Sequence, residues 1–225
     1  MNGLTGSDRF LLQGGRIARD APFAFSLLFV LLAFLCGSLP FSVWLGKMFL
    51  HRDVRRYGDG NPGATNAFRA GGRFVALLAL MLDIAKGAAP VGVAYFTLGY
   101  RGWTMFFVAL APILGHAFSP FLGFRGGKAV AVSFGVWIGL TLWRISLPAV
   151  LLVLLWTALI DVSGWAVMLA LAGMLVVMLI WLPNPLLLAT LAGQAGILAW
   201  THRADLRKKP HLRAWLGRWL GRERS

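Results

Sequence analysis

Residues 73–98 read RFVALLALMLDIAKGAAPVGVAYFTL, and their only charged side chains are Arg73, Asp83 and Lys86. A helix needs about 20 apolar residues to cross the hydrocarbon core of a bilayer, and this run is long enough to do so. Asp83 and Lys86 stand three residues apart, which places them on one face of a helix. Because charges inside a membrane are costly and usually paired, we interpret them as a structural ion pair rather than as catalytic groups.

The same apolar character extends over most of the chain. Residues 23–49 form a second long run, and shorter runs cover 103–118, 128–142, 147–162, 165–182 and 185–201. Hydrophobic residues make up 58% of the 225 residues and charged residues only 13%, whereas soluble proteins carry about a quarter of charged residues. The pattern predicts an all-α integral membrane protein with about seven transmembrane helices joined by short loops.

The basic residues indicate how the chain crosses the membrane. A net charge of +14 suits either nucleic acid or an anionic membrane surface, and the apolar runs favour the membrane. With seven crossings, 16 Lys and Arg residues lie in the loops 47–73 and 119–128 and in the C-terminal tail, against five on the other side. The positive-inside rule predicts a cytoplasmic C-terminus and an external N-terminus, with the arginines of the N-terminal segment counting against this choice.

The chain is predicted to contain one membrane domain over residues 23–206, preceded by a polar segment over residues 1–22. Residues 207–225 alternate Lys and Arg with Leu and Trp. This spacing is typical of a basic amphipathic helix that lies on an anionic membrane surface. A disordered, solvated tail is the alternative.

The first polar loop on the predicted cytoplasmic side has the composition of an anion-binding site. Glycine permits turns in which successive backbone N–H groups point at an anion, and arginine offers a fork that fits a phosphate. The residues concerned are Gly58, Gly60, Asn61, Gly63, Thr65, Asn66 and Arg69. The alternative is a glycine-rich turn with arginines at the membrane interface.

The second polar loop places Gly126, Gly127 and Lys128 directly before an apolar run. Glycines and a lysine at a helix N-terminus are typical of phosphate sites. The spacing is not that of a nucleotide-binding P-loop, so we do not expect ATP to bind.

A third polar group, His202, Arg203 and Asp205, follows the last apolar run, where it could simply end a membrane helix. Three cation-bearing loops on the same side of the membrane predict a pocket for a small polyanion. No metal or cofactor is predicted.

These strings resemble, in the same order, those of the acyl-phosphate:glycerol-3-phosphate acyltransferases, the PlsY family. The resemblance covers about Leu35 to Lys208, and its most specific strings are Gly-x-Gly-Asn-x-Gly-Ala-Thr-Asn-x-x-Arg and Phe-Arg-Gly-Gly-Lys. It implies a multi-pass enzyme of the bacterial inner membrane with a cytoplasmic active site. It also implies transfer of a fatty acyl group from acyl phosphate to the sn-1 hydroxyl of glycerol 3-phosphate, which gives lysophosphatidic acid for phospholipid biosynthesis.

The resemblance assigns substrate binding to all three loops, with Arg69 and Lys128 as the expected holders of the two phosphates. The matching residues are Asn61, Gly63, Thr65, Asn66 and Arg69 in the first loop, Gly126, Gly127 and Lys128 in the second, and His202 and Arg203 in the third. The implied partners are acyl phosphate, glycerol 3-phosphate and membrane lipids, with a donor-supplying acyltransferase as a candidate. Nucleic acid is not expected.

The chain departs from the family pattern at several positions. Asp59 and Asp205 stand where the family usually has serine and asparagine, Ala166 stands where the family has a substrate-site serine, and Ala129 replaces a glycine. Two unit charges about 4 Å apart repel by roughly 4 kcal/mol at an effective dielectric near 20, so the aspartates oppose a phosphate. Asp59 could instead accept the hydroxyl proton, which would make it catalytic. A relative that binds phosphorylated lipid precursors without catalysis, or an anion transporter, is the alternative.

Overall fold

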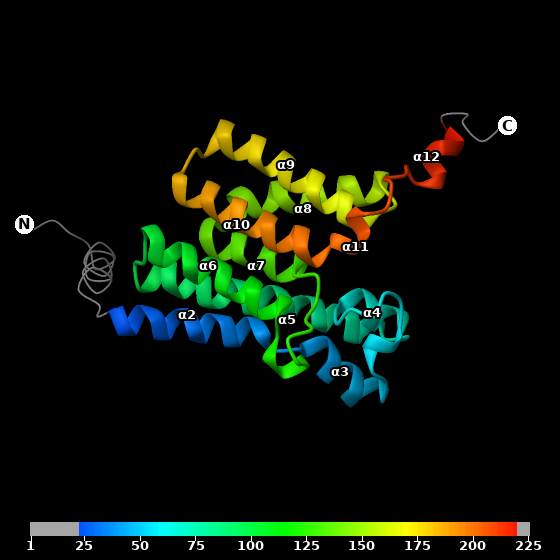
Figure 1. The fold of residues 1–225 in the computed structure, drawn as a ribbon, viewed down its shortest axis with the longest axis horizontal. Helices are drawn as coiled ribbons and strands as arrows, with labels where there is room; N and C mark the ends of the chain where they lie inside the picture. The colour runs from blue at the N-terminus through cyan, green and yellow to red at the C-terminus, as the bar shows by residue number, and fades with distance from the viewer. Residues whose placement is uncertain (1–22, 220–225) are drawn as a thin grey trace, which may run out of the picture. The chain divides into compact units, whose positions relative to one another are not determined.

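The computed structural model describes residues 23–219, and over this range the chain is helical with no β-strand (Figure 1). The described chain forms two compact units, residues 23–142 and 143–219, whose positions relative to one another are not determined. The polar segment predicted over residues 1–22 lies outside the described residues, as do the last residues of the tail, 220–225.

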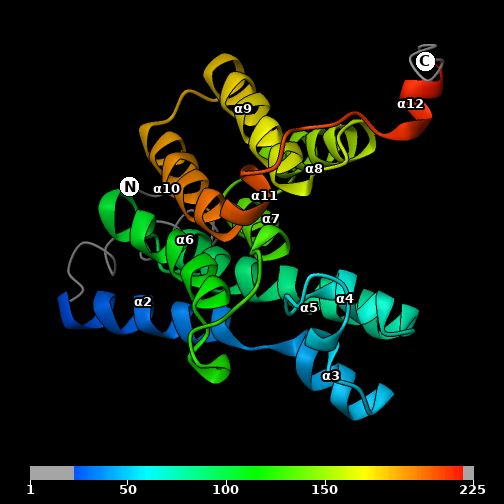
Figure 2. The same ribbon diagram turned by 45° about the vertical axis from the view of Figure 1, so that its right-hand side comes forward.

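The first unit begins with two helices that share one apolar run. Helix α2 (Phe23–Ser38) and helix α3 (Phe41–Leu50) are separated at Pro40. Proline has no backbone N–H and cannot continue a helix without breaking its hydrogen bonds, and α3 departs from the line of α2 at this point (Figures 1 and 2). The other elements of the unit are η1 (Val54–Arg56), α4 (Ala64–Arg69), α5 (Arg73–Gly92), η2 (Val93–Thr97), α6 (Gly102–Ala117), η3 (Pro120–Leu122) and α7 (Val130–Thr141).

Within the described residues, four stretches are long and apolar enough to cross a membrane, namely Phe23–Leu50, Arg73–Thr97, Gly102–Leu122 and Ser163–Trp181. The remaining apolar helices are shorter, and α7 has 12 residues, which corresponds to about 18 Å at 1.5 Å per residue. The hydrocarbon core is about 30 Å thick. The structure therefore supports the predicted all-helical membrane class, whereas seven full crossings are not confirmed.

Glycines bring the backbones of α5 and α7 into direct contact. A Cβ atom added at Gly87 would overlap the carbonyl oxygen of Val132, and one added at Gly135 would overlap the carbonyl oxygen of Ile84. Helices in lipid associate through close packing at small residues, since lipid tails are as apolar as the side chains. The α5–α7 pair therefore depends on the absence of side chains at these positions.

Helices α2 and α6 also come into close backbone contact at glycines. A Cβ atom at Gly37 would overlap the backbone of Pro112, and one at Gly115 would overlap the carbonyl oxygen of Phe34. This contact places the C-terminal end of α6 beside the C-terminal end of α2, next to the loop that carries Lys128.

A buried ion pair holds the break between α2 and α3. Lys86 Nζ lies 2.7 Å from Asp83 Oδ1 and donates a hydrogen bond to the carbonyl oxygen of Leu39 at 2.8 Å. The Leu39 carbonyl follows the end of α2, where helices leave carbonyl groups without helical partners and favour a cation. The ion pair inferred from the sequence is therefore present, and it supports the chain where Pro40 interrupts the first span.

The second unit comprises α8 (Trp143–Leu159), α9 (Ser163–Trp181), α10 (Pro185–Thr201), α11 (Arg203–Leu206) and α12 (Ala214–Trp219). The predicted tail helix from residue 207 is wrong for residues 207–213, because helix resumes only at Ala214. Residues 211–213 instead pair with residues 159–161 through backbone hydrogen bonds and one isolated β-bridge. These bonds satisfy backbone groups that a helix over the same residues would have satisfied internally.

We expect Gly135→Ala to destabilise the protein by about 1–3 kcal/mol, because the added methyl group would force the α5 and α7 backbones apart. Thermal unfolding of the purified protein in detergent measures the effect. Gly92→Ala is the matched control, since a Cβ atom at Gly92 would meet only Gly139 Cα at 3.8 Å, an ordinary contact. Equal unfolding midpoints for the two variants would contradict the proposed packing.

We expect Lys86→Met and Asp83→Leu to destabilise the protein separately by about 3–5 kcal/mol, because each leaves a buried charge without its partner. The double variant should lose less than the sum of the two, since it leaves neither charge behind. The three unfolding midpoints form a double-mutant cycle. Additive losses would show that the two charges do not depend on one another.

Candidate functional site

The first candidate loop folds around the carboxylate of Asp59. The backbone N–H of Asn61 and the side-chain Nδ2 of Asn66 donate to Asp59 Oδ1 at 3.2 and 2.9 Å. Lys128 Nζ, from the second loop, lies 2.9 Å from Asp59 Oδ2. The structure therefore brings the first loop and Lys128 together, with a carboxylate between them.

Two glycines shape this loop. Gly58 and Gly60 have φ angles of 60° and 77°, a left-handed conformation that glycine adopts without steric cost. A Cβ atom at Gly58 would also overlap Arg69 Nη1 and Asn66 Oδ1. Glycine at position 58 therefore lets the α4 side chains approach the turn.

Helix α4 supplies the polar side chains of the first loop. Asn66 and Arg69 are three residues apart and so lie on one face of α4, and Arg69 Nη1 lies 3.5 Å from Asn66 Oδ1. Asn66 is buried, whereas Arg69 and Thr65 are exposed. Asn66 also donates to the carbonyl oxygen of Asn61 at 2.9 Å, so it ties the turn to the helix while Arg69 remains accessible.

The anion-binding nest inferred from the glycines is only partly available. The backbone N–H of Gly60 donates to the carbonyl oxygen of Tyr57, and that of Asn61 donates to Asp59. The Asp59 carboxylate thus occupies the Asn61 N–H, which the predicted nest would have offered to a phosphate.

The second loop is anchored to the end of α6. Gly126 and Gly127 donate their backbone N–H groups to the carbonyl oxygens of Ala117 and His116, both at 3.1 Å. A Cβ atom at Gly126 would overlap the His116 carbonyl oxygen. These two N–H groups are therefore engaged within the protein, and the glycines allow a close approach that positions Lys128.

The electrostatics of the loop are dominated by Asp59. Burial raises the pKa of the Asp59 carboxyl, but hydrogen bonds from Lys128, Asn61 and Asn66 lower it by more, so this pKa lies well below its ordinary value. The side-chain hydrogen bond from Arg55 likewise lowers the pKa of Asp53 to about 2. Both carboxylates are ionised at neutral pH, and Asp59 offsets the charge of Lys128.

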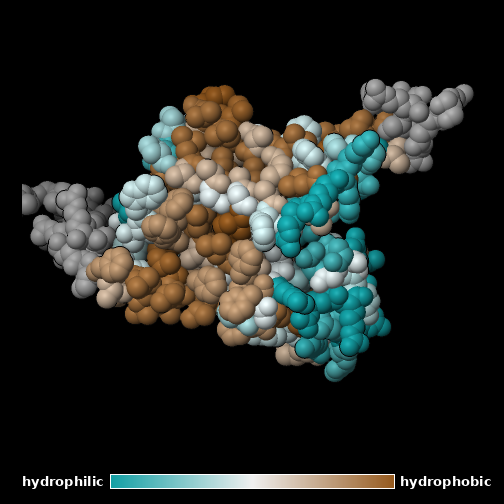
Figure 3. All heavy atoms as spheres, in the orientation of Figure 1, coloured by the Kyte–Doolittle hydropathy of each residue, from teal (hydrophilic) through white to brown (hydrophobic). Residues whose placement is uncertain are grey.

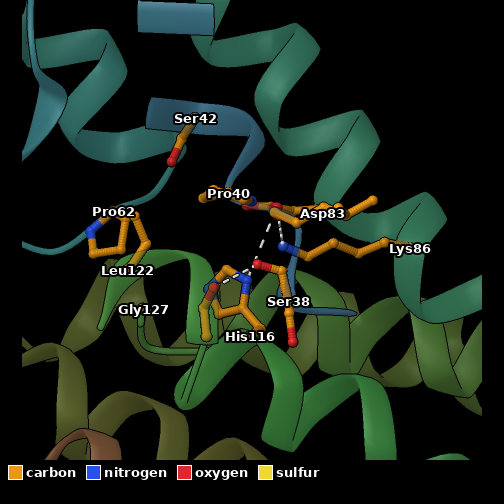
Figure 4. Close-up of a pocket in the computed structure, with 11 residues that line it drawn as sticks. Ser38, Pro40, Ser42, Pro62, Asp83, Lys86, His116, Leu122 and Gly127 are labelled. Carbon is orange, nitrogen blue, oxygen red and sulfur yellow. Dashed lines mark hydrogen bonds and ion pairs between the residues drawn. The ribbon is translucent and has the colours of Figure 1, made fainter. Parts of the chain in front are cut away.

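A pocket lies between the two loops and the α2–α3 break (Figure 4). Its lining is polar on one side, where Asp83, Lys86 and His116 point toward one another, and His116 Nδ1 lies 3.9 Å from Asp83 Oδ1. The lining residues are Ser38, Leu39, Pro40, Ser42, Pro62, Asp83, Lys86, His116, Ser119, Leu122 and Gly127. The serines of this pocket were not predicted as site residues, and the Gly-Ser-Leu-Pro string at residues 37–40 was the sequence signal that could have identified Ser38.

The third polar group belongs to the second unit. His202 is buried, with Nδ1 2.9 Å from the carbonyl oxygen of Leu198. The Arg203 guanidinium lies over the Trp200 ring, 4.7 Å from its centroid, and Asp205 accepts a hydrogen bond from Ser163 at 3.0 Å. The first two contacts are local to the end of α10 and the start of α11, and the Ser163–Asp205 bond joins α11 to the start of α9. Their gathering with the first two loops stays a prediction.

Hydrophilic side chains cover the end of the first unit that carries α4, whereas hydrophobic side chains cover α2 (Figure 3). Most large hydrophobic residues of α2 are exposed, among them Leu27, Leu28, Leu31 and Leu32. Exposed leucines along a helix suit contact with lipid rather than with water. The site loops therefore lie at the polar end of an apolar bundle.

Comparison with known proteins identifies the family of this chain. The sequence model of a family described as glycerol-3-phosphate acyltransferase matches residues 27–209. The chain is 40% identical over 185 residues to the glycerol-3-phosphate acyltransferase of Aromatoleum aromaticum, covering 81% of this chain and 91% of the relative. It is 39% identical over 184 residues to that of Pseudomonas aeruginosa, covering 80% of this chain and 93% of the relative.

Two solved structures are also similar. The crystal structure of PlsY, an integral membrane glycerol 3-phosphate acyltransferase, in its glycerol 3-phosphate form matches with a TM-score of 0.72 and 28% identity, covering 89% of this chain and 94% of that chain. The lysophosphatidic acid form matches with a TM-score of 0.71 and 27% identity over the same shares. The family match, the relatives and the shared fold together show that this chain belongs to the glycerol-3-phosphate acyltransferase family, the family of PlsY.

Proposed function

We propose that this chain transfers a fatty acyl group from acyl phosphate to the sn-1 hydroxyl of glycerol 3-phosphate and releases lysophosphatidic acid and phosphate. Membership of the family supports the acyltransferase activity. The observation that carries the assignment to this site is the convergence of Asn61, Asn66 and Lys128 on one anionic group, with Arg69 beside them. Phosphate oxygens are acceptors of the same kind as that carboxylate.

The chemistry requires little covalent participation by the protein. The glycerol hydroxyl oxygen attacks the acyl carbonyl carbon, the bond from that carbon to the phosphate oxygen breaks, and phosphate leaves with the electron pair. The departing phosphate accepts the hydroxyl proton, so charge and atoms balance. Lys128 and Arg69 hold the two phosphates, which places the hydroxyl beside the carbonyl and neutralises developing negative charge.

The other loop residues have supporting roles in this proposal. Asn61, Thr65 and Asn66 offer neutral donors, and Gly58, Gly60 and Gly63 shape the turn that carries them. Gly126 and Gly127 position Lys128 through their bonds to α6. His202, Arg203 and Asp205 are assigned to substrate binding only by the family resemblance, and this assignment stays a prediction.

A proton-accepting role for Asp59 is disfavoured. Hydrogen bonds hold its pKa well below the ordinary carboxyl range, and a general base works best when its pKa lies near the operating pH. We therefore assign Asp59 to the control of Lys128 rather than to proton transfer.

The proposed location follows from charge. We propose that the site and the C-terminus face the cytoplasm of a bacterial inner membrane, since Lys and Arg are concentrated in the loops and tail on that side. A donor-supplying acyltransferase that makes acyl phosphate would act before this enzyme.

Purified protein in detergent should release phosphate from palmitoyl phosphate only when glycerol 3-phosphate is also present. Palmitoyl-CoA should not replace the donor, because the chain lacks the His-x-x-x-x-Asp motif of the CoA-dependent acyltransferases. Binding of radiolabelled glycerol 3-phosphate without any product would instead identify a relative that has lost catalysis.

We expect Arg69→Ala and Lys128→Ala to lower kcat/KM by about 10²-fold or more each, because each removes a cation that stabilises the phosphates in the transition state. Steady-state phosphate release measures the loss. Arg55→Ala is the matched control, since Arg55 lies in the same loop and pairs with Asp53 at 2.6 Å. Wild-type turnover in either test variant would refute its assigned role.

A further inference from the structure

The donors of the two loops already surround an anion that belongs to the protein. The Asn61 N–H and Asn66 Nδ2 are directed at one oxygen of Asp59, and Lys128 Nζ is directed at the other. We call the space that these three donors surround the anion position. Both oxygens of the carboxylate are engaged there, so the anion position is filled before any substrate arrives.

The same three donors are those that the proposed function assigns to a substrate phosphate. A carboxylate and a phosphate cannot share them without strong repulsion, because like charges in contact are poorly screened at a partly buried site. One of the two anions has to leave. Binding of a phosphate through Lys128 therefore requires that the Asp59–Lys128 ion pair first opens.

The loop is built so that Asp59 can leave. Its side chain is 44% exposed, compared with 25% for Lys128, so the carboxylate can turn into water without disturbing packed side chains. Gly58 and Gly60 flank it, and both hold positive φ angles. Glycine populates many backbone conformations, which lets the short segment between them change direction.

We propose that Asp59 is a built-in competitor for the anion position and that the phosphate of an incoming substrate displaces it, so that Asp59 sets the affinity for one phosphorylated substrate. This proposal rests on the proposed function. Its ligand class is a phosphate monoester or acyl phosphate, two sources that share the same recognition chemistry. Asp59 is a specificity-determining residue in this view, since an incoming anion has to displace its carboxylate from Lys128.

Asp59→Asn tests the charge with little change of shape. The asparagine Oδ1 can still accept from Asn61 and Asn66, but it no longer holds Lys128 by charge. We expect the KM for one of the two substrates to fall about 3- to 10-fold, because the variant removes a partly exposed ion pair that competes with substrate binding. The kcat should change by less than about 3-fold, and the KM of the other substrate should stay near its wild-type value.

The separate KM values identify the phosphate that displaces Asp59. A fall for glycerol 3-phosphate assigns the anion position to the acceptor, and a fall for palmitoyl phosphate assigns it to the donor. Asp59→Ser is the second variant and should act in the same direction. Asp53→Asn is the matched control, because Asp53 is an ion-paired aspartate of the same loop whose partner is Arg55, and its KM values should match the wild type.

Lys128→Gln supplies the coupling test. If Asp59 competes for Lys128, Asp59→Asn should no longer lower KM in the Lys128→Gln background. Unchanged or raised KM values for both substrates in Asp59→Asn, with active wild type, would overturn the proposal while leaving the proposed function intact.

Equilibrium binding measurements distinguish a failure of the proposed function from a failure of the competitor proposal. If the wild type binds radiolabelled glycerol 3-phosphate or inorganic phosphate but shows no turnover, the proposed function fails, and the competitor proposal is judged from the dissociation constants. Tighter binding by Asp59→Asn than by wild type would support it. Equal or weaker binding of both ligands by Asp59→Asn would overturn it.

Discussion

The site depends on one buried cation at the break of the first membrane span. Pro40 ends α2 and leaves the Leu39 carbonyl without a helical donor inside an apolar bundle, where each unsatisfied polar group costs several kcal/mol. Lys86 donates to that carbonyl, and Asp83 compensates the charge of Lys86. His116 lies beside the pair, and its own carbonyl holds Gly127. The break, the ion pair and the second loop are thus one connected structure.

The loops of the candidate site differ from this break, since they hold their charged groups in water rather than in lipid. Lys128 without a substrate is a cation beside a cluster of donors, and Asp59 neutralises it. A carboxylate at this place keeps the loop ordered through bonds to Asn61 and Asn66. The same bonds oppose the binding of a phosphate. In the proposed mechanism, the Asp59 side chain therefore orders the loop of the free enzyme and, by the same contacts, weakens substrate binding.

Much of this chain was predictable from local pattern. Long apolar runs, an Asp-Lys pair at helical spacing and two glycine-rich strings predict a helical membrane protein, its buried ion pair and its candidate site loops. Other features were not predictable. The tail alternates cations with Leu and Trp, which suits a helix. Residues 211–213 instead form backbone hydrogen bonds with residues 159–161, which are distant in the sequence. Hydrophobic period alone carries no information about such distant partners.

The sequence by itself determined the membrane class, the family and the residue types of the candidate site loops, because these follow from composition and from ordered strings of residues. Only the tertiary structure decided what those residues touch. The Gly126 and Gly127 N–H groups bond to α6. Asp59 contacts both Asn66 and Lys128, which stand 7 and 69 residues after it in the sequence. The physical reason is that hydrogen bonds and ion pairs act over about 3 Å in space, and separation along the chain does not reveal which groups come that close.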